Sequence, residues 1–136
     1  MINRRDFGKL VLGATALSFT ACNSLASGLS TIPANKKRVV IVGGGFGGAA
    51  TARYLRKFDS NVEIVLVEQN KEYYTCPFSN AVIAGMEKMD FIKHDLSTLA
   101  KKYNIKVVYA KVAKVDGASS SVILENGEKI SYTKAV

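Results

Sequence analysis

The length and composition of the chain are those of one globular unit. It has 136 residues, which favours one domain at most, and its hydrophobic content of 48% is too high for a disordered tail. The formal net charge is +8, but the basic residues are scattered and no basic stripe alternates with aromatic residues. The charge therefore indicates a solvated surface with a basic bias, and no nucleic-acid partner is predicted.

The first 26 residues have the three-part architecture of an export signal. A short basic region with Arg4 and Arg5 leads into an apolar run over residues 10–21, which is too short to span a bilayer as an ordinary helix. The Arg-Arg pair resembles the twin-arginine consensus, although Gly8 replaces the usual Leu, and an ordinary signal that contains Arg-Arg is the alternative. We expect residues 1–26 to be a twin-arginine signal peptide and the mature protein to be periplasmic.

One cysteine near the end of this segment has two possible fates. Cys22 loosely fits a lipoprotein box, in which it would be acylated after cleavage, and otherwise it is removed with the signal. A membrane partner is expected only if Cys22 is lipidated. Residues 27–36 are small and polar and contain Pro33, so they are predicted to be a linker.

A strand, a glycine loop, a helix and a second strand are predicted to follow the linker. Residues 38–42 form a continuous apolar, β-branched run, typical of a strand buried on both faces of a parallel sheet. All but one of residues 43–48 are glycine, residues 49–58 are predicted to be a helix, and residues 61–67 a second strand.

The glycines match the G-x-G-x-x-G pattern that binds dinucleotides. Gly43 permits the tight turn off the strand, Gly45 lets the backbone approach a pyrophosphate, and Gly48 allows close packing of helix on sheet. The phosphates would lie at the helix N-terminus, where free N–H groups favour negative charge. Glu68, at the end of the second strand, can accept hydrogen bonds from both ribose hydroxyls and would repel a 2′-phosphate. The pattern disfavours NADP but does not separate NAD from FAD.

The second half of the chain mixes loops, helices and strands. The predicted elements are a loop from Gln69, a short helix at 80–84, a helix at 90–103, a third parallel strand at 106–110, and antiparallel strands at 112–115, 121–125 and 129–131 with a tight turn at Asn126-Gly127. Residues 132–136 are predicted to begin another buried strand. We expect the chain to be truncated there, with the main catalytic groups beyond Val136.

Cys76 is the only cysteine after the predicted signal, in a compartment where thiols oxidise. The residues alone leave three fates open: a buried inert thiol, a disulfide to a cysteine beyond residue 136, or attachment to another group. His94, the only histidine, is interpreted as a surface or helix-packing residue.

Residues 39–48, Glu68 and the segment Tyr-Tyr-Thr-Cys-Pro-Phe-Ser-Asn at 73–80 resemble the flavoprotein subunit of flavocytochrome c sulfide dehydrogenase. The similarity extends over residues 37–136, and the Tyr-Tyr-Thr-Cys segment is its specific part. The resemblance implies FAD as cofactor, held by a thioether from Cys76 to its 8α-methyl group. It also implies oxidation of sulfide, with electrons passing through FAD to a c-type cytochrome subunit.

The resemblance implies an α/β fold: a Rossmann-like FAD-binding domain of the disulfide-reductase-like flavoproteins with two dinucleotide-binding domains. Residues 37–136 would be its incomplete N-terminal part, inactive alone. The predicted cofactor-binding residues are Gly43, Gly45, Phe46, Gly47, Gly48, Glu68, Gln69, Cys76 and Val112, and no metal site is predicted. The alternatives are a sulfide:quinone oxidoreductase or type II NADH dehydrogenase, which usually lack the twin-arginine and Tyr-Tyr-Thr-Cys features, and a truncated, non-catalytic nucleotide-binding fragment.

Overall fold

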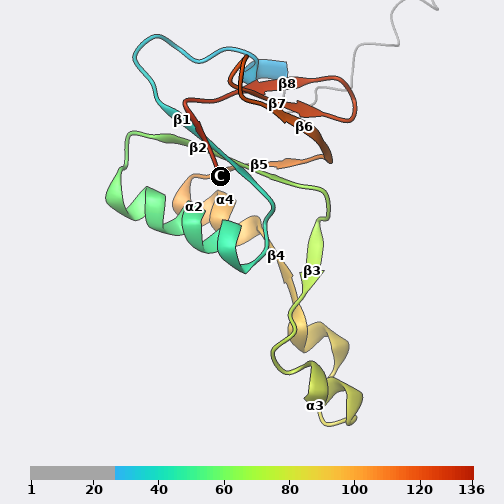
Figure 1. Ribbon diagram of the computed structural model, residues 1–136. Coiled ribbons are helices and arrows are strands. Elements are labelled where there is room, and N and C mark those ends of the chain that lie inside the picture. Colours follow the sequence, from blue (N-terminus) through green and yellow to red (C-terminus); the bar gives the residue numbers. More distant parts are fainter. Residues whose placement is uncertain (1–26) are drawn as a thin grey trace, which may run out of the picture.

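The computed structural model describes residues 27–136, so the predicted export signal with Arg4, Arg5 and Cys22 lies outside the described residues. Within 27–136 the central sheet has four strands, all parallel, in the order β5-β2-β1-β9 (Figure 1). Their bounds are β1 (Arg38–Val42), β2 (Glu63–Glu68), β5 (Lys106–Tyr109) and β9 (Lys134–Ala135).

Both faces of this sheet are covered, which explains the continuous apolar runs of β1 and β2. Helices α2 (Phe46–Phe58) and α4 (Ser97–Tyr103) lie on one face (Figure 1). An antiparallel meander of β6 (Val112–Asp116), β7 (Ser121–Leu124) and β8 (Lys129–Ser131) lies on the other.

Alternate residues of β2 divide the core into two clusters. Ile64 and Leu66 belong to the helix-side cluster, whereas Val65 and Val67 belong to the meander-side cluster. This is the period of two that a strand imposes on its side chains. The buried members of the helix-side cluster are Ile41, Ala52, Val62, Ile64, Leu66, Leu96, Leu99 and Ile105.

A long excursion connects β2 to α4. It contains β3 (Glu72–Tyr74) and β4 (Lys93–Asp95), which pair as an antiparallel ribbon, and α3 (Ser79–Ile83) with a 3-10 helix (Met89–Ile92) beyond the ribbon. Figure 1 shows this excursion projecting away from the sheet. We call residues 69–95 the arm; they include Cys76.

Most predicted elements are confirmed. The strand at 38–42, the parallel third strand, the meander and the turn at Asn126-Gly127 are present, with Gly127 in the left-handed region at φ +84°. Helix α2 begins at Phe46, three residues earlier than predicted, and the short helix is Ser79–Ile83.

Three predictions are wrong in part. The predicted helix at 90–103 is interrupted, because Lys93–Asp95 pair with Glu72–Tyr74 of the arm, in a stretch predicted to be a loop. The strand near the end of the chain forms, but Lys134 and Ala135 are exposed rather than buried, because β9 lies at the edge of the sheet. The predicted linker contains a 3-10 helix (Ser27–Leu29), whose Leu29 joins the meander-side core.

No helix within residues 27–136 combines the length and the apolar character that a bilayer crossing requires.

Candidate functional site

The glycine loop leaves β1 in a conformation and a packing that side chains would disrupt. Gly43 has φ +97°, and its N–H donates a hydrogen bond to the carbonyl of Val67 over 2.8 Å. A Cβ atom at Gly48 would overlap with the carbonyl oxygen of Gly43 and come within 3.3 Å of Ile41 Cγ2. The first turn of α2 therefore lies directly against the end of β1, which is the contact that the role predicted for Gly48 requires.

The start of α2 suits an anion. Gly45 is its N-cap residue and has no side chain to satisfy the first amides, and the first turn contains no acidic residue. A Cβ atom at Gly45 or Gly47 would meet no atom within 4 Å, so the backbone is accessible there. Exposed N–H groups and the helix dipole favour a phosphate at this position. The residues present therefore fit the pyrophosphate of a dinucleotide.

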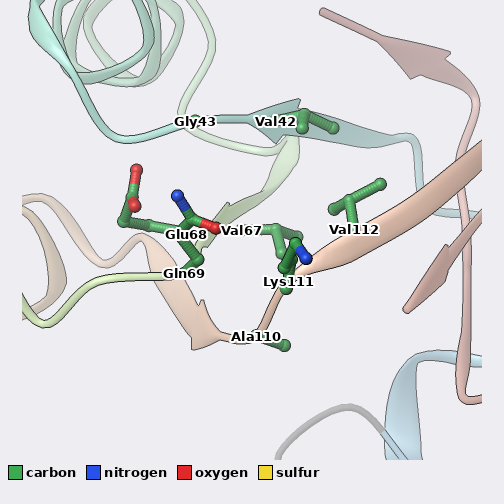
Figure 2. A pocket seen from close by; sticks show the side chains of 8 residues that line it. All are labelled: Val42, Gly43, Val67, Glu68, Gln69, Ala110, Lys111 and Val112. Atoms are coloured by element: carbon green, nitrogen blue, oxygen red, sulfur yellow. The ribbon is translucent and has the colours of Figure 1, made fainter. Parts of the chain in front are cut away.

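A pocket of about 260 Å³ lies at the carboxyl ends of β1, β2 and β5 (Figure 2). Ligands of open α/β sheets bind at this edge. Four of the predicted cofactor-binding residues line it, namely Gly43, Glu68, Gln69 and Val112, together with Val42, Val67, Ala110 and Lys111. The pocket thus unites residues from distant parts of the sequence next to the glycine loop.

The carboxylate of Glu68 is held by two backbone amides. Its Oε2 atom accepts a hydrogen bond from the N–H of Gly44 over 2.6 Å, and its Oε1 atom accepts one from the N–H of Asn70 over 2.9 Å. These bonds fix the carboxylate beside the glycine loop, and each oxygen keeps capacity for a further donor. Binding of a ribose by Glu68 stays a prediction.

A second hollow, of about 390 Å³, lies between the loop and the arm. It is lined by Phe46, Thr75, Pro77, Phe78, Phe91, Ile92 and His94. The neighbours of Cys76 on both sides thus share this hollow with Phe46, the first residue of α2. Cys76 itself is exposed and forms no disulfide within residues 27–136, so this part of the chain does not bury its thiol.

Aromatic contacts connect the same residues. The ring of Phe46 meets that of Tyr73 edge-on at 6.4 Å between centroids, and Tyr73 lies 5.8 Å from His94, its cross-strand partner. His94 is exposed on β4, not on a helix. Of the predicted residues, Phe46 therefore lies with the arm, whereas Gly45, Gly47 and Gly48 line neither hollow.

Two residues near the end of β5, Tyr109 and Lys111, were not predicted as site residues from the sequence. Lys111 lines the pocket and forms an ion pair of 2.7 Å with Glu125. Burial raises the pKa of Tyr109, and the carboxylates of Asp95 and Glu68 raise it further, so the phenol stays protonated near neutral pH. The available signal was their position at the end of the third parallel strand.

Comparisons with known proteins agree with this geometry. The family model described as pyridine nucleotide-disulphide oxidoreductase matches residues 37–136. The chain is 65% identical over 46 residues to the sulfide dehydrogenase [flavocytochrome c] flavoprotein chain of Chlorobaculum thiosulfatiphilum, covering 34% of this chain and 96% of that sequence. It is 32% identical over 96 residues to the sulfide-quinone reductase of Aquifex aeolicus, covering 71% of this chain and 22% of the relative.

Solved structures show the same similarity. The sulfide:quinone oxidoreductase from Aquifex aeolicus superposes with a TM-score of 0.67 at 31% identity, over 73% of this chain and 23% of that one. A putidaredoxin reductase–putidaredoxin complex gives a TM-score of 0.62 at 25% identity, over 73% and 24% of the two chains. The chain therefore spans less than a quarter of the sulfide-quinone reductase sequence and of each of these two structures.

Proposed function

The chain belongs to the pyridine nucleotide-disulphide oxidoreductase family and, within it, to the flavoprotein chains of flavocytochrome c sulfide dehydrogenase, and from this premise we propose that it forms the FAD-binding part of an exported enzyme that oxidises sulfide. The predicted α/β class, with the Rossmann-like unit of disulfide-reductase-like flavoproteins, is confirmed by the family match and the structural neighbours.

The observation that carries the proposal is the open, uncapped start of α2 beside the sheet-end pocket. Backbone amides of Gly45 to Gly48 would hold the pyrophosphate, and Glu68 would bind the adjoining ribose hydroxyls. Gln69 and Val112 line the same pocket and would contact the adenosine part of the cofactor. Bound FAD supplies an acceptor for two electrons that can leave one at a time.

We further propose that Cys76 bonds to the 8α-methyl carbon of FAD. The support is its exposed thiol, the hollow formed by its neighbours and Phe46, and the resemblance of its segment. Such a carbon–sulfur bond would replace one S–H and one C–H bond, and the flavin would take up the two electrons and two hydrogens released. Those electrons would then pass to the proposed cytochrome partner, and the covalent link would prevent cofactor loss after export.

The proposed partner is a c-type cytochrome subunit, and the proposed location is the periplasm, reached by the twin-arginine route. The support for the partner is the name of the Chlorobaculum relative, and the support for export is the Arg4-Arg5 segment. A second candidate is quinone as electron acceptor, favoured by the similarity to the Aquifex sulfide:quinone oxidoreductase. Sulfide-dependent reduction of cytochrome c, compared with reduction of a soluble quinone, distinguishes the two.

The test of the cofactor is acid precipitation of the intact polypeptide purified from its native host. We expect a yellow pellet from the wild type, and flavin released into the supernatant from Cys76→Ser, because serine retains the size of the side chain without the sulfur nucleophile. Flavin in the Cys76→Ser supernatant would also show that the variant still binds FAD and has lost only the covalent attachment. A wild-type protein without any flavin would refute the proposed function.

A further inference from the structure

The two residues that flank the arm meet at one glycine of the loop. Glu68 immediately precedes the arm and Leu96 immediately follows it. The Oε2 atom of Glu68 accepts the hydrogen bond of Gly44 N–H over 2.6 Å. A Cβ atom at Gly44 would lie 2.6 Å from Leu96 Cδ1 and 3.3 Å from both Cβ and Cγ of Glu68. Gly44, a variable position of the glycine pattern, is thus enclosed by the two residues that flank the arm.

Leu96 has little freedom to move away from Gly44. Its side chain is 2% exposed and belongs to the helix-side core. Its carbonyl accepts hydrogen bonds from the N–H groups of Leu99 and Ala100, so it also begins α4. A close-packed interior resists displacement of such a residue.

A second connection lies on the other side of Gly45. Phe46, which follows Gly45, contacts Tyr73 of β3, and Tyr73 contacts His94 of β4. The arm therefore contacts the residue after Gly45, and the two residues that flank the arm contact the residue before it. Gly45 itself, where a Cβ atom would meet nothing within 4 Å, is the point of closest approach predicted for a pyrophosphate.

We propose that Leu96 is a positioning residue that couples the dinucleotide loop to the arm carrying Cys76, by fixing Gly44 between the two residues that flank the arm, Glu68 and Leu96. This inference rests on the proposed function for the identity of the ligand. Coupling of this kind is reciprocal: cofactor held at the loop stabilises the arm, and an ordered arm strengthens cofactor binding. The Cys76 thiol and the phosphate site are thereby held in a fixed relation.

The test is a rescue experiment in the full chain, with FAD affinity and hydrogen exchange of residues 69–95 as the two readouts. Gly44→Ala places a methyl group against Leu96, and we expect FAD binding to weaken by about ten-fold or more. Arm amides should exchange faster in the same variant. Adding Leu96→Ala removes Cδ1, the atom opposite the new methyl group, together with the rest of the isobutyl chain beyond Cβ, and should restore most of both properties.

Leu99→Ala is the matched control. Leu99 is a buried leucine of the same core cluster, but none of its atoms is among the three nearest to a Cβ at Gly44. Rescue of Gly44→Ala by Leu96→Ala and not by Leu99→Ala supports the proposal. Equal rescue by both, rescue by neither, or a Gly44→Ala variant with unchanged FAD affinity and arm exchange overturns it.

The proposal can still be tested if Gly44→Ala does not fold or if the wild type contains no flavin. If Gly44→Ala does not fold, Leu96→Ala alone is compared with Leu99→Ala: faster arm exchange in the former supports the coupling, and equal exchange contradicts it. If the wild type contains no flavin, the proposed function is lost, whereas the arm-exchange comparison still decides whether Leu96 couples the arm to the loop.

Discussion

Glu63 forms an ion pair with Arg38, a buried arginine at the start of β1. The Nε atom of Arg38, a side chain 2% exposed, lies 2.7 Å from Glu63 Oε2, and Lys106 Nζ lies 2.6 Å from Oε1. Burial raises the pKa of Glu63, but the hydrogen bonds from Lys106 and Arg38 outweigh it, so the pKa is lowered. Because the pKa of Glu63 is lower in the folded than in the unfolded state, its ionised form stabilises the fold at pH values above the unfolded pKa. This stabilisation is lost as the pH falls through the folded pKa.

We therefore expect Glu63→Gln to destabilise the protein by about 2 kcal/mol near neutral pH, because the arginine stays buried without its carboxylate. The difference should shrink below about pH 4 and disappear as the wild-type carboxyl is protonated. Denaturant unfolding at a series of pH values measures it. Lys106→Gln, which removes the more exposed partner, should cost less than about 1 kcal/mol. A Glu63→Gln difference that persisted in acid would contradict this account.

Substitutions at two glycines of the loop should affect FAD binding and stability differently. Gly45 has φ −65°, which alanine tolerates, and open space around it, so Gly45→Ala should change stability by less than about 1 kcal/mol while weakening FAD binding. Gly48→Ala forces a methyl group into the backbone of Gly43 and should cost at least about 2 kcal/mol. Melting temperatures and flavin titrations compare the two variants. Equal stability losses in both would show that the two positions are not distinguished by packing.

At the scale of elements, local pattern predicted the β1–α2–β2 unit because the signals are near one another in sequence. The apolar strand, the glycines and Glu68 all lie within residues 38–68. The helix expected at 90–103 was wrong because pairing of Lys93–Asp95 with Glu72–Tyr74 is not encoded locally. The crowding of Gly44 by Leu96 likewise joins residues far apart in the chain, so no motif could reveal it. Residues gathered at the strand ends were predictable, since parallel strands share their carboxyl edge.

Helix α4 begins where the ribbon ends, and Asp95 marks the boundary. Its Oδ1 atom accepts hydrogen bonds from the N–H and the Oγ–H of Ser97, and these bonds lower the pKa of the carboxyl. We expect Asp95→Ala to increase hydrogen exchange at the start of α4 near neutral pH, with the difference fading in acid as wild-type Asp95 is protonated. Asp90→Ala, which removes a carboxylate of the arm that lies 3.3 Å from Lys93 Nζ, is the control.

At the scale of the whole molecule, the two parts of the proposed FAD site lie on different parts of the fold. The carboxyl edge of the sheet forms the pocket beside the glycine loop, and the arm, whose sequence includes Cys76, projects away from the sheet (Figure 1). A protein that must hold a cofactor on both parts benefits from folding before export, which is consistent with the twin-arginine route that we propose.

Export provides the test at this scale. Replacing Arg4 and Arg5 together by lysine should retain the precursor in the cytoplasm, because the pair is the feature that the twin-arginine route recognises. Immunoblotting of periplasmic and cytoplasmic fractions measures it, and Lys9→Arg, which keeps the charge outside the pair, should export normally. Unchanged export of the double lysine variant would indicate the general secretion route.

The contact between Gly44 and Leu96 has a consequence for how related sequences vary. A methyl group at position 44 would occupy the space that the Cδ1 methyl group of Leu96 fills, so we expect substitutions at the two positions to be correlated among homologues. Homologues with alanine or serine in place of Gly44 should carry a shorter side chain in place of Leu96, and those that keep the glycine should be free to retain the leucine. Correlated substitution at positions 44 and 96 would thus reflect the same packing of Leu96 against Gly44 that positions the loop in this molecule.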